Sequence, residues 1–295
     1  MNRSSSPVIN DKDSKKSRAA LLISRILAYT FLILVSVLCL FSFYMLVVNS
    51  TRSNAQLQAG FTLLPQENFF VNLQAAWTDA SINIPRGMLN SLIVASCSAI
   101  LTTYFSALTA YGIHAYTFRF KKLAFAFIMA VMMIPPQVSA VGFVQIMNQL
   151  KLTNNFLPLI LPSIAAPIVF FYMKQYMESV LQMEIVEAAR VDGSNEFRTF
   201  NTIVLPIMKP AIAVQMIFTF VQSWNNYFVP ALLLDKAEMK TVPIMIAQLR
   251  SADYSKFDMG KVYMFILLAI IPVVIIYMLL SKSIIKGVTA GSVKG

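Results

Sequence analysis

The sequence predicts an all-α, polytopic membrane protein with six transmembrane helices. Hydrophobic residues make up 57% of the 295 residues, charged residues only 13%, and the mean hydropathy is +0.66, which is too apolar for an ordinary soluble globule. Six apolar stretches are close to the ~20 residues with which a helix crosses a ~30 Å hydrocarbon core. They lie near residues 26–48, 88–113, 123–147, 155–173, 211–234 and 262–281.

The amino-terminal part is expected to consist of a tail, one span and a long loop. Residues 1–22 are rich in Ser, Lys and Asp and have no apolar periodicity, which predicts a disordered cytoplasmic tail. The apolar run that follows shows no small-residue cleavage pattern, so residues 23–84 are expected to hold a retained first helix and an outer loop. Within this loop, residues 69–77 predict a short interfacial helix, with Trp77 at the headgroup level.

The distribution of positive charge predicts the orientation. If six helices alternate from a cytoplasmic amino terminus, 16 of the 24 Lys and Arg are cytoplasmic and eight are outside, which favours both termini in the cytoplasm. No basic stripe interleaved with aromatics occurs outside the spans, so the net charge of +11 does not predict nucleic-acid binding. Cys39 and Cys97 fall within predicted spans and have no metal-ligand neighbours, so no metal site is expected.

Residues 85–285 are expected to form the transmembrane core, and prolines interrupt two of its spans. Pro135 and Pro136 lie in the third span, and Pro158, Pro162 and Pro167 lie in the fourth. Each proline removes a helical donor, which membrane helices tolerate where neighbouring protein or water satisfies the freed carbonyl. The spans are therefore expected to pack around a pathway, or to be kinked helices of a bundle without one.

A polar cytoplasmic loop, residues 174–209, separates the fourth and fifth spans. Residues 183–191 predict a helix, and Gly193 can adopt the left-handed conformation that ends it. Ser194 or Asn195 can cap a second short helix. That helix is expected to place Phe197, Phe200 and Val204 along one face and to close at Leu205 and Pro206.

This loop has the chemistry of a docking element. The small Ala188 and Ala189 permit close approach, Glu187 offers a charge to a basic partner, and Phe197 and Phe200 are anchors of the kind that fill a pocket. From spacing alone, an amphipathic loop lying on the lipid surface is the alternative.

The fifth span carries a polar and aromatic group that suits a sugar. Its members are Gln222, Trp224, Asn225, Asn226 and Tyr227. We expect Gln222 and Asn225, three residues apart on one helix face, to line a translocation path, and Trp224 to pack or gate. Hydrogen bonding of these amides to adjacent helices is the alternative.

Several functional classes are disfavoured by what the sequence lacks. The six spans contain no Asp, Glu, Lys or Arg, which weakens an ion-coupled secondary transporter because such proteins usually need an ionisable residue at membrane depth. No G-x4-G-K-[ST] loop, H-E-x-x-H pair or G-x-S-x-G elbow occurs. The chain is therefore expected to be no enzyme, to bind no cofactor itself and to draw energy from a separate subunit.

Three motifs resemble those of a known family. The spacing E-A-A-x3-G-x9-I-x-L-P, from Glu187 to Pro206, resembles the signature of permease subunits of bacterial ABC importers. The segment S-W-N-N-Y at 223–227 resembles the W-N-E-[YF] segment of sugar permeases, with Asn226 where an acid is common. The ending G-V-T-A-G-S-V-K-G at 287–295 resembles that of the second permease of maltose-type importers. The resemblance covers roughly residues 85–295.

The resemblance implies a type I ABC importer permease fold in a bacterial cytoplasmic membrane, in which Glu187, Ala188, Ala189, Gly193, Leu205 and Pro206 dock a cytoplasmic ATPase. It also implies that the tail 286–295, with Gly291, Lys294 and Gly295, contacts that ATPase. The expected partners are a second permease, two ATPase domains holding ATP and Mg, an extracytoplasmic sugar-binding protein and membrane lipid. The expected cargo is a carbohydrate, with an oligosaccharide foremost. The alternatives are a polyol, glycerol phosphate or peptide permease, an ion-coupled transporter or a membrane-bound enzyme.

Overall fold

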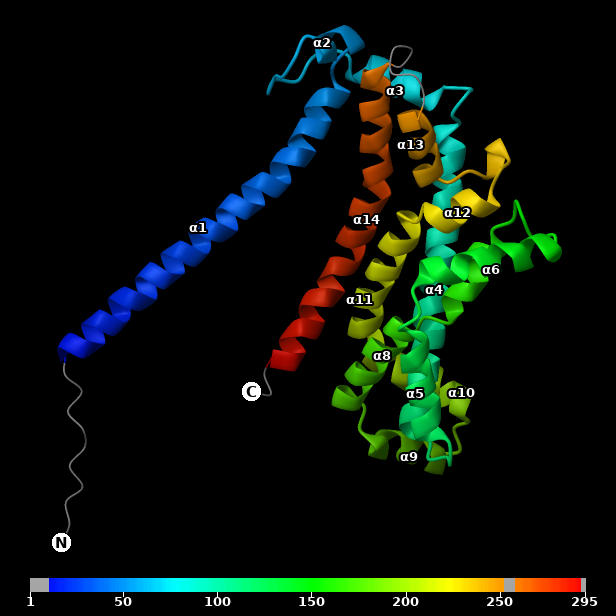
Figure 1. Ribbon diagram of the computed structural model, residues 1–295. Helices are drawn as coiled ribbons and strands as arrows, with labels where there is room; N and C mark the ends of the chain where they lie inside the picture. Colours follow the sequence, from blue (N-terminus) through cyan, green and yellow to red (C-terminus); the bar gives the residue numbers. More distant parts are fainter. Residues whose placement is uncertain (1–10, 252–257, 293–295) are drawn as a thin grey trace.

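The computed structural model describes residues 11–251 and 258–292, which form helices and turns without a β-strand. The predicted all-α fold is confirmed. The body of the bundle consists of α4 (Ile84–Ala115), α8 (Pro167–Val180), α11 (Leu205–Trp224) and α14 (Met259–Ser292). These helices run between an end that carries α3 (Phe69–Trp77) and an end that carries α9 (Met183–Val191), here named the α3 end and the α9 end (Figure 1).

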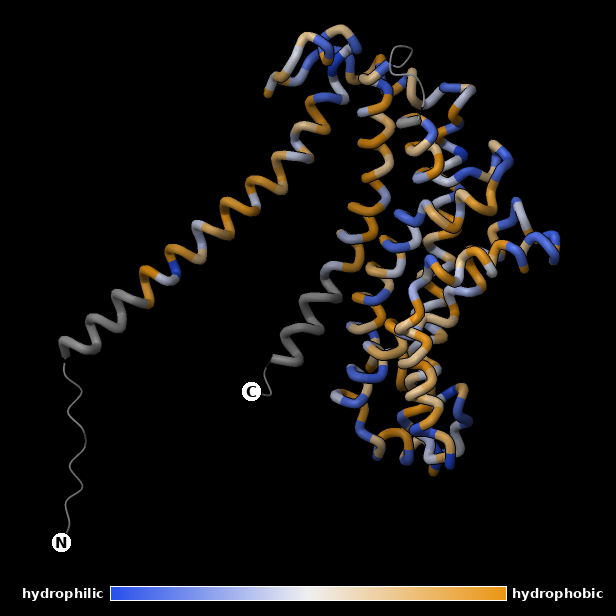
Figure 2. Tube along the Cα trace, viewed as in Figure 1, coloured by the Kyte–Doolittle hydropathy of each residue, from blue (hydrophilic) through white to orange (hydrophobic). Residues whose placement is uncertain are grey.

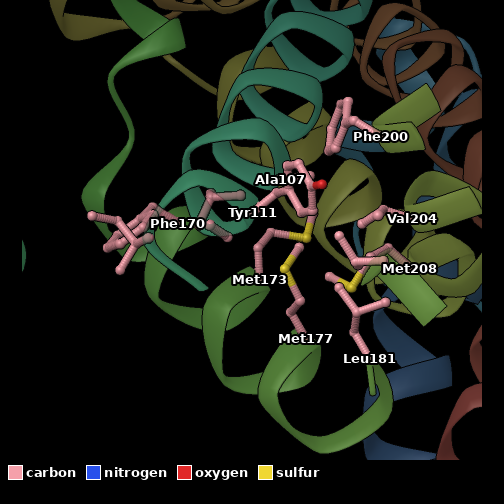
Figure 3. Close-up of a cluster of buried hydrophobic side chains, with 13 residues drawn as sticks. Ala107, Tyr111, Phe170, Met173, Met177, Leu181, Phe200, Val204 and Met208 are labelled. Atoms are coloured by element: carbon pink, nitrogen blue, oxygen red, sulfur yellow. The ribbon is translucent and has the colours of Figure 1, made fainter. Parts of the chain in front are cut away.

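Two clusters of buried apolar side chains hold the bundle together. One lies toward the α9 end and joins α4, α8, α9 and α11; Tyr111, Met173, Phe200 and Met208 are among its members (Figure 3). The other joins α4, α11, α14 and α13 (Val242–Ser251) and includes Trp224. Such close packing supplies much of the attraction between helices in a bilayer, where lipid tails are as apolar as the side chains.

Helix α1 (Asp11–Ser50) departs from the bundle over most of its length (Figure 1). Side chains 21–44 are all exposed, and the helix is apolar along this stretch (Figure 2). The predicted disordered tail 1–22 differs in the structure, because the chain is already helical from Asp11 onward. Residues 1–10 lie outside the described residues. Beyond α1, α2 (Asn54–Gln58) precedes α3, whose bounds match the predicted interfacial helix.

The predicted count of six continuous spans is not confirmed. Among the described residues, five helical stretches are long and apolar enough to cross a membrane: Leu21–Ser50, Ile84–Ala115, Leu157–Val180, Glu196–Trp224 and Met259–Ser281. The expected third span is instead divided into α5 (Lys121–Val131) and α6 (Pro136–Gln149). Pro135 has an extended backbone, with ψ 128°, and Pro136 is the first residue of α6, where its missing N–H has no helical role.

Prolines also divide the fourth span into α7 (Leu157–Ile160), a 3-10 turn at Leu161–Ile164, and α8. Pro167 cannot donate to the carbonyl of Ser163, four residues earlier. Thr102 of α4 donates its hydroxyl to that carbonyl at 2.7 Å. The expectation that neighbouring protein satisfies carbonyls freed by proline is therefore confirmed at this position.

The fifth span differs from its predicted bounds of 211–234. Its helix ends at Trp224, and the chain continues through the short α12 (Phe228–Leu233) and a 3-10 turn (Ala237–Met239) into α13. At its other end α11 continues directly from α10 (Glu196–Thr199). The crossing helix therefore begins inside the predicted cytoplasmic loop.

Candidate functional site

The signature residues lie on α9 and the turn after it, at one end of the molecule. Helix α9 has the predicted bounds, and its two faces differ in burial. Val186 and Ala189 are buried against the bundle, whereas Glu187 and Ala188 are exposed, and Val191 is 87% exposed. Ala189 therefore supports packing within this chain, and Ala188 is the small residue open to a partner.

Gly193 ends α9 in the predicted left-handed conformation, with φ 77°. Its N–H donates to Arg190 O at 3.0 Å, and the N–H of Ser194 donates to Ala189 O at 2.9 Å. Asn195 then caps α10, because its Oδ1 accepts from the N–H of Arg198 at 2.8 Å. Helices α9 and α10 are thus joined through a short corner that these three hydrogen bonds stabilise.

The second helix does not close at Leu205 and Pro206. A π-helical segment, Phe200–Val204, connects α10 to α11, and the N–H of Leu205 donates to Phe200 O. A π turn shifts the bonding pattern by one residue, and Pro206, which has no N–H to donate, is the second residue of α11. Leu205 is half-buried and Pro206 is exposed, both within continuous helix.

The two predicted aromatic anchors have different environments. Phe197 is 67% exposed, whereas Phe200 is completely buried, with its ring centroid 5.6 Å from those of Tyr104 and Tyr111 on α4 (Figure 3). The prediction that Phe200 anchors a partner is wrong, because α4 covers it. The side chain of Phe197 is open to contact by a partner. A hollow of 560 Å³ beside the corner is lined by Ala188, Gly193 and Arg198, among others.

A polar cluster missed by the sequence analysis joins this corner to α4. Arg190 Nε lies 2.7 Å from Glu196 Oε1, and the Tyr111 hydroxyl donates to Glu196 Oε2 at 2.6 Å. The guanidinium of Arg190 also lies 5.4 Å from the centroid of the Tyr116 ring. The hydrogen bond with Glu196 raises the pKa of Arg190, so this side chain stays charged. Opposite charges placed on either side of Gly193 were the available signal in the sequence.

The second candidate site lies where α11 ends. Asn225 is the C-cap, with its N–H donating to Val221 O at 3.0 Å. Trp224, Asn225 and Tyr227 line a hollow of 680 Å³ together with α1, α13 and α14. Gln222 is exposed but does not line this hollow, so the hollow does not bring together the predicted pair of Gln222 and Asn225. Asn226 is exposed and also lies outside the lining.

Trp224 has the packing position that the sequence predicts. It is 3% exposed, its Nε1 donates to Ala269 O at 3.2 Å, and its ring stacks on Phe220 with centroids 5.8 Å apart. A buried indole normally needs such a partner for its N–H. Trp224 thus forms the apolar wall of the hollow and ties the end of α11 to α14.

The carboxyl-terminal prediction is only partly within the described residues. Helix α14 continues to Ser292, so Gly291 is helical and the chain does not become a separate tail at residue 286. Lys294 and Gly295 lie outside the described residues. Within the described part of the chain, no group of three His, Cys, Asp or Glu side chains could hold a metal ion.

A large part of this chain matches a family of membrane transport proteins. Residues 99–289 match the family described as binding-protein-dependent transport system inner membrane component. The arabinooligosaccharides transport system permease protein AraQ of Bacillus subtilis is 32% identical over 92% of this chain and 96% of its own length. The lactose transport system permease protein LacG of Rhizobium radiobacter is 28% identical over 91% and 96%.

One further relative is named for a different cargo, and one solved structure shares the fold of this chain. The sn-glycerol-3-phosphate transport system permease protein UgpE of Salmonella typhi is 30% identical over 89% of this chain and 95% of its own length. The crystal structure of a bacterial ABC transporter that imports the acidic polysaccharide alginate contains a chain of the same fold. That chain matches with a TM-score of 0.74 and 20% identity, over 94% of this chain and 99% of its own length.

Proposed function

This chain belongs to the family of binding-protein-dependent transport system inner membrane components, and we propose that it forms half of the membrane pathway of an ABC importer for an oligosaccharide. The observation that carries the proposal is the complete signature from Glu187 to Pro206, folded as a rigid corner with Glu187 and Ala188 exposed. Relatives named for arabinooligosaccharides and lactose support a carbohydrate cargo.

The proposed complex contains a second permease, two ATPase domains and an extracytoplasmic sugar-binding protein. ATP and Mg belong to the ATPase, because this sequence has no phosphate-binding loop. The proposed cellular location is the bacterial cytoplasmic membrane, with both termini in the cytoplasm. The beginning of α1 and the end of α14 point toward the α9 end (Figure 1), which supports termini on the side of the ATPase.

The proposed mechanism is alternating access driven from the α9 end. The ATPase seats against Glu187, Ala188 and Phe197 and displaces the corner when it closes around ATP. Because α10, the π segment and α11 form one helical path, displacement of the corner moves α11 along its whole length. The far end of that path is Trp224, in the wall of the 680 Å³ hollow.

We assign the sugar pathway in this chain to Asn225 and Tyr227, whose polar atoms lie beside the apolar wall made by Trp224. A sugar has apolar ring faces and many hydroxyls, which aromatic and amide groups recognise together. The named lining of the hollow is uncharged. This favours a neutral sugar over glycerol phosphate, the cargo named for one relative and the second candidate here.

The function is tested in proteoliposomes that contain the complete importer, with arabinooligosaccharide, lactose and glycerol phosphate offered in competition. ATP-dependent uptake of a neutral oligosaccharide is expected. Uptake of glycerol phosphate alone would replace the carbohydrate assignment.

The pathway is tested with Asn225→Cys in a background lacking Cys39 and Cys97. A membrane-impermeant thiol reagent should label this variant, and sugar should protect it. The matched variant Gln222→Cys should gain no protection from sugar. Absence of labelling of Asn225→Cys in every nucleotide state would exclude Asn225 from the pathway.

We also propose that the last residues, Gly291, Lys294 and Gly295, contact the ATPase, because the chain's ending resembles that of maltose-type permeases. Residues 291–295 follow the last apolar stretch, 262–281, so a chain that lacks them should still insert while binding-protein-stimulated ATP hydrolysis falls. Unchanged hydrolysis would show these residues to be dispensable.

A further inference from the structure

An ion pair closes the corner between α9 and α10, and its main effect is on the geometry of the corner rather than on the free energy of folding. Arg190 and Glu196 flank Gly193, and Arg190 Nε lies 2.7 Å from Glu196 Oε1. Both side chains keep about a third of their surface exposed, and exposed ion pairs contribute little to folding free energy. The pair does, however, hold α9 and α10 at a fixed angle, because each partner belongs to a different arm of the corner.

The second oxygen of Glu196 extends this contact to a different part of the chain. The hydroxyl of Tyr111 on α4 donates to it at 2.6 Å, across 85 residues of sequence. Tyr111 is 2% exposed, so its hydroxyl is held in one direction by the surrounding cluster. Glu196 is thus bonded both to Arg190 of α9 and to Tyr111 of α4.

A second contact lies two helical turns away on the same side of α4. Tyr104 donates its hydroxyl to Asn201 Oδ1 at 3.2 Å, and its ring packs on Phe200. Tyr104 and Tyr111 therefore fix α10 and the π segment to α4 at two heights. Apolar burial alone is non-directional, whereas charge-assisted hydrogen bonds constrain direction and distance.

We propose that Glu196 is a positioning residue that makes α4 move together with α9 and α11 when the ATPase displaces the corner. This inference rests on the proposed function. Helix α4 carries Thr102, which satisfies the carbonyl freed by Pro167, so movement of α4 also reaches the broken fourth span. Through the contacts of Glu196, a displacement of the corner would thereby move α4 and the fourth span as well as α11.

The experiment uses the complete importer in proteoliposomes and measures sugar moved per ATP hydrolysed. Glu196→Gln keeps the side-chain shape but removes the charge, and Tyr111→Phe removes only the hydroxyl. Each should lower this ratio about five- to tenfold, within the range of ordinary coupling free energies between sites. Assembly of the complex and basal ATP hydrolysis should persist.

Two further variants separate positioning from general damage. Glu178→Gln is the matched control, because it removes an ion pair of 2.6 Å with Lys174 that lies within one helix, and its ratio should equal that of the wild type. The exchange Arg190→Glu with Glu196→Arg restores opposite charges across the corner but removes the carboxylate that accepts from the Tyr111 hydroxyl. It should therefore restore assembly where a single change impairs it, while the ratio stays low.

The inference is overturned if both Glu196→Gln and Tyr111→Phe transport at the wild-type ratio, or if Glu178→Gln loses as much. It is also overturned if the single variants fail to assemble and the charge exchange does not restore assembly. A wild-type complex that hydrolyses ATP but moves no sugar would instead refute the proposed function itself.

Discussion

Substitution of Gly193 by Val tests whether the corner must keep its shape. Gly193 has φ 77°, and a Cβ added there would have no atom within 4 Å. Within this chain the effect is therefore backbone strain without a clash. The left-handed region costs an L-residue about 1–2 kcal/mol, and a β-branched side chain is the least suited to it. Divided by RT, this strain shifts the population of the native corner by roughly 5- to 30-fold.

The strain predicts an order among substitutions that a contact with the partner would not. Asn accepts the left-handed region, and Asn154 of this chain already has φ 53°. Transport should therefore fall least in Gly193→Asn, more in Gly193→Ala and most in Gly193→Val. Gly142→Val is the control, because its added Cβ also meets nothing within 4 Å, on a backbone without positive φ.

The assay is ATP-driven sugar uptake, with binding-protein-stimulated ATP hydrolysis measured in parallel. Gly193→Val should abolish uptake and uncouple or suppress hydrolysis, while the membrane content of the complex stays normal. Wild-type uptake in this variant would refute the requirement for the corner. Equal damage from Asn and Val would refute strain as the cause and indicate that the partner occupies the space beside Gly193.

Three other predictions concern the body of the protein. Thr102→Val should lower the free energy of unfolding by about 1–3 kcal/mol, because it leaves the carbonyl of Ser163 without a donor; an unchanged Tm in detergent would contradict this. Trp224→Phe keeps an aromatic side chain but loses the hydrogen bond from the indole N–H to Ala269 O of α14. It should lower the free energy of unfolding by about 0.5–1.5 kcal/mol in the same assay. Burial alone would raise the pKa of Asp79, but hydrogen bonds led by that of Lys261 lower it to about 2. Because the pKa in the folded state lies below the usual value of 3.8, Asp79 contributes to stability above that pH, and the contribution is lost as pH falls toward 2. Asp79→Asn should therefore flatten the dependence of Tm on pH over that window.

Segments with strong local signals were predicted with the correct bounds. The helices at 69–77 and 183–191 end where the sequence indicates, the second because Gly193 alone can supply the turn at low cost. The division of α9 into a buried side with Val186 and an exposed side with Glu187 follows from helical periodicity. These features depend on neighbours within a few residues, which a single sequence contains.

The errors arise where distant contacts decide the structure. The stretch 211–234 contains no charged residue, yet α11 ends at Trp224. Hydrogen bonds from Trp224 to α14 and from the N–H groups of Asp235 and Lys236 to Asn154 Oδ1 fix the segment that follows. None of these partners lies within one helical turn. Hydropathy therefore located a membrane segment but could not locate the helix end that opens the 680 Å³ hollow.

The continuation of helix through Pro206 changes how the signature itself is understood. As a stop signal, Leu205 and Pro206 would leave a flexible joint between the docking corner and the membrane, and a push on Glu187 would be lost there. The π segment instead carries the helix past the proline, so that α10 and α11 are joined without an interruption. Because Phe200 is buried against α4 rather than exposed, this helical path also packs on α4 beside the corner where the ATPase is proposed to bind. Under the proposed function, a displacement of the corner would therefore reach α11 through continuous helix rather than being lost at Pro206.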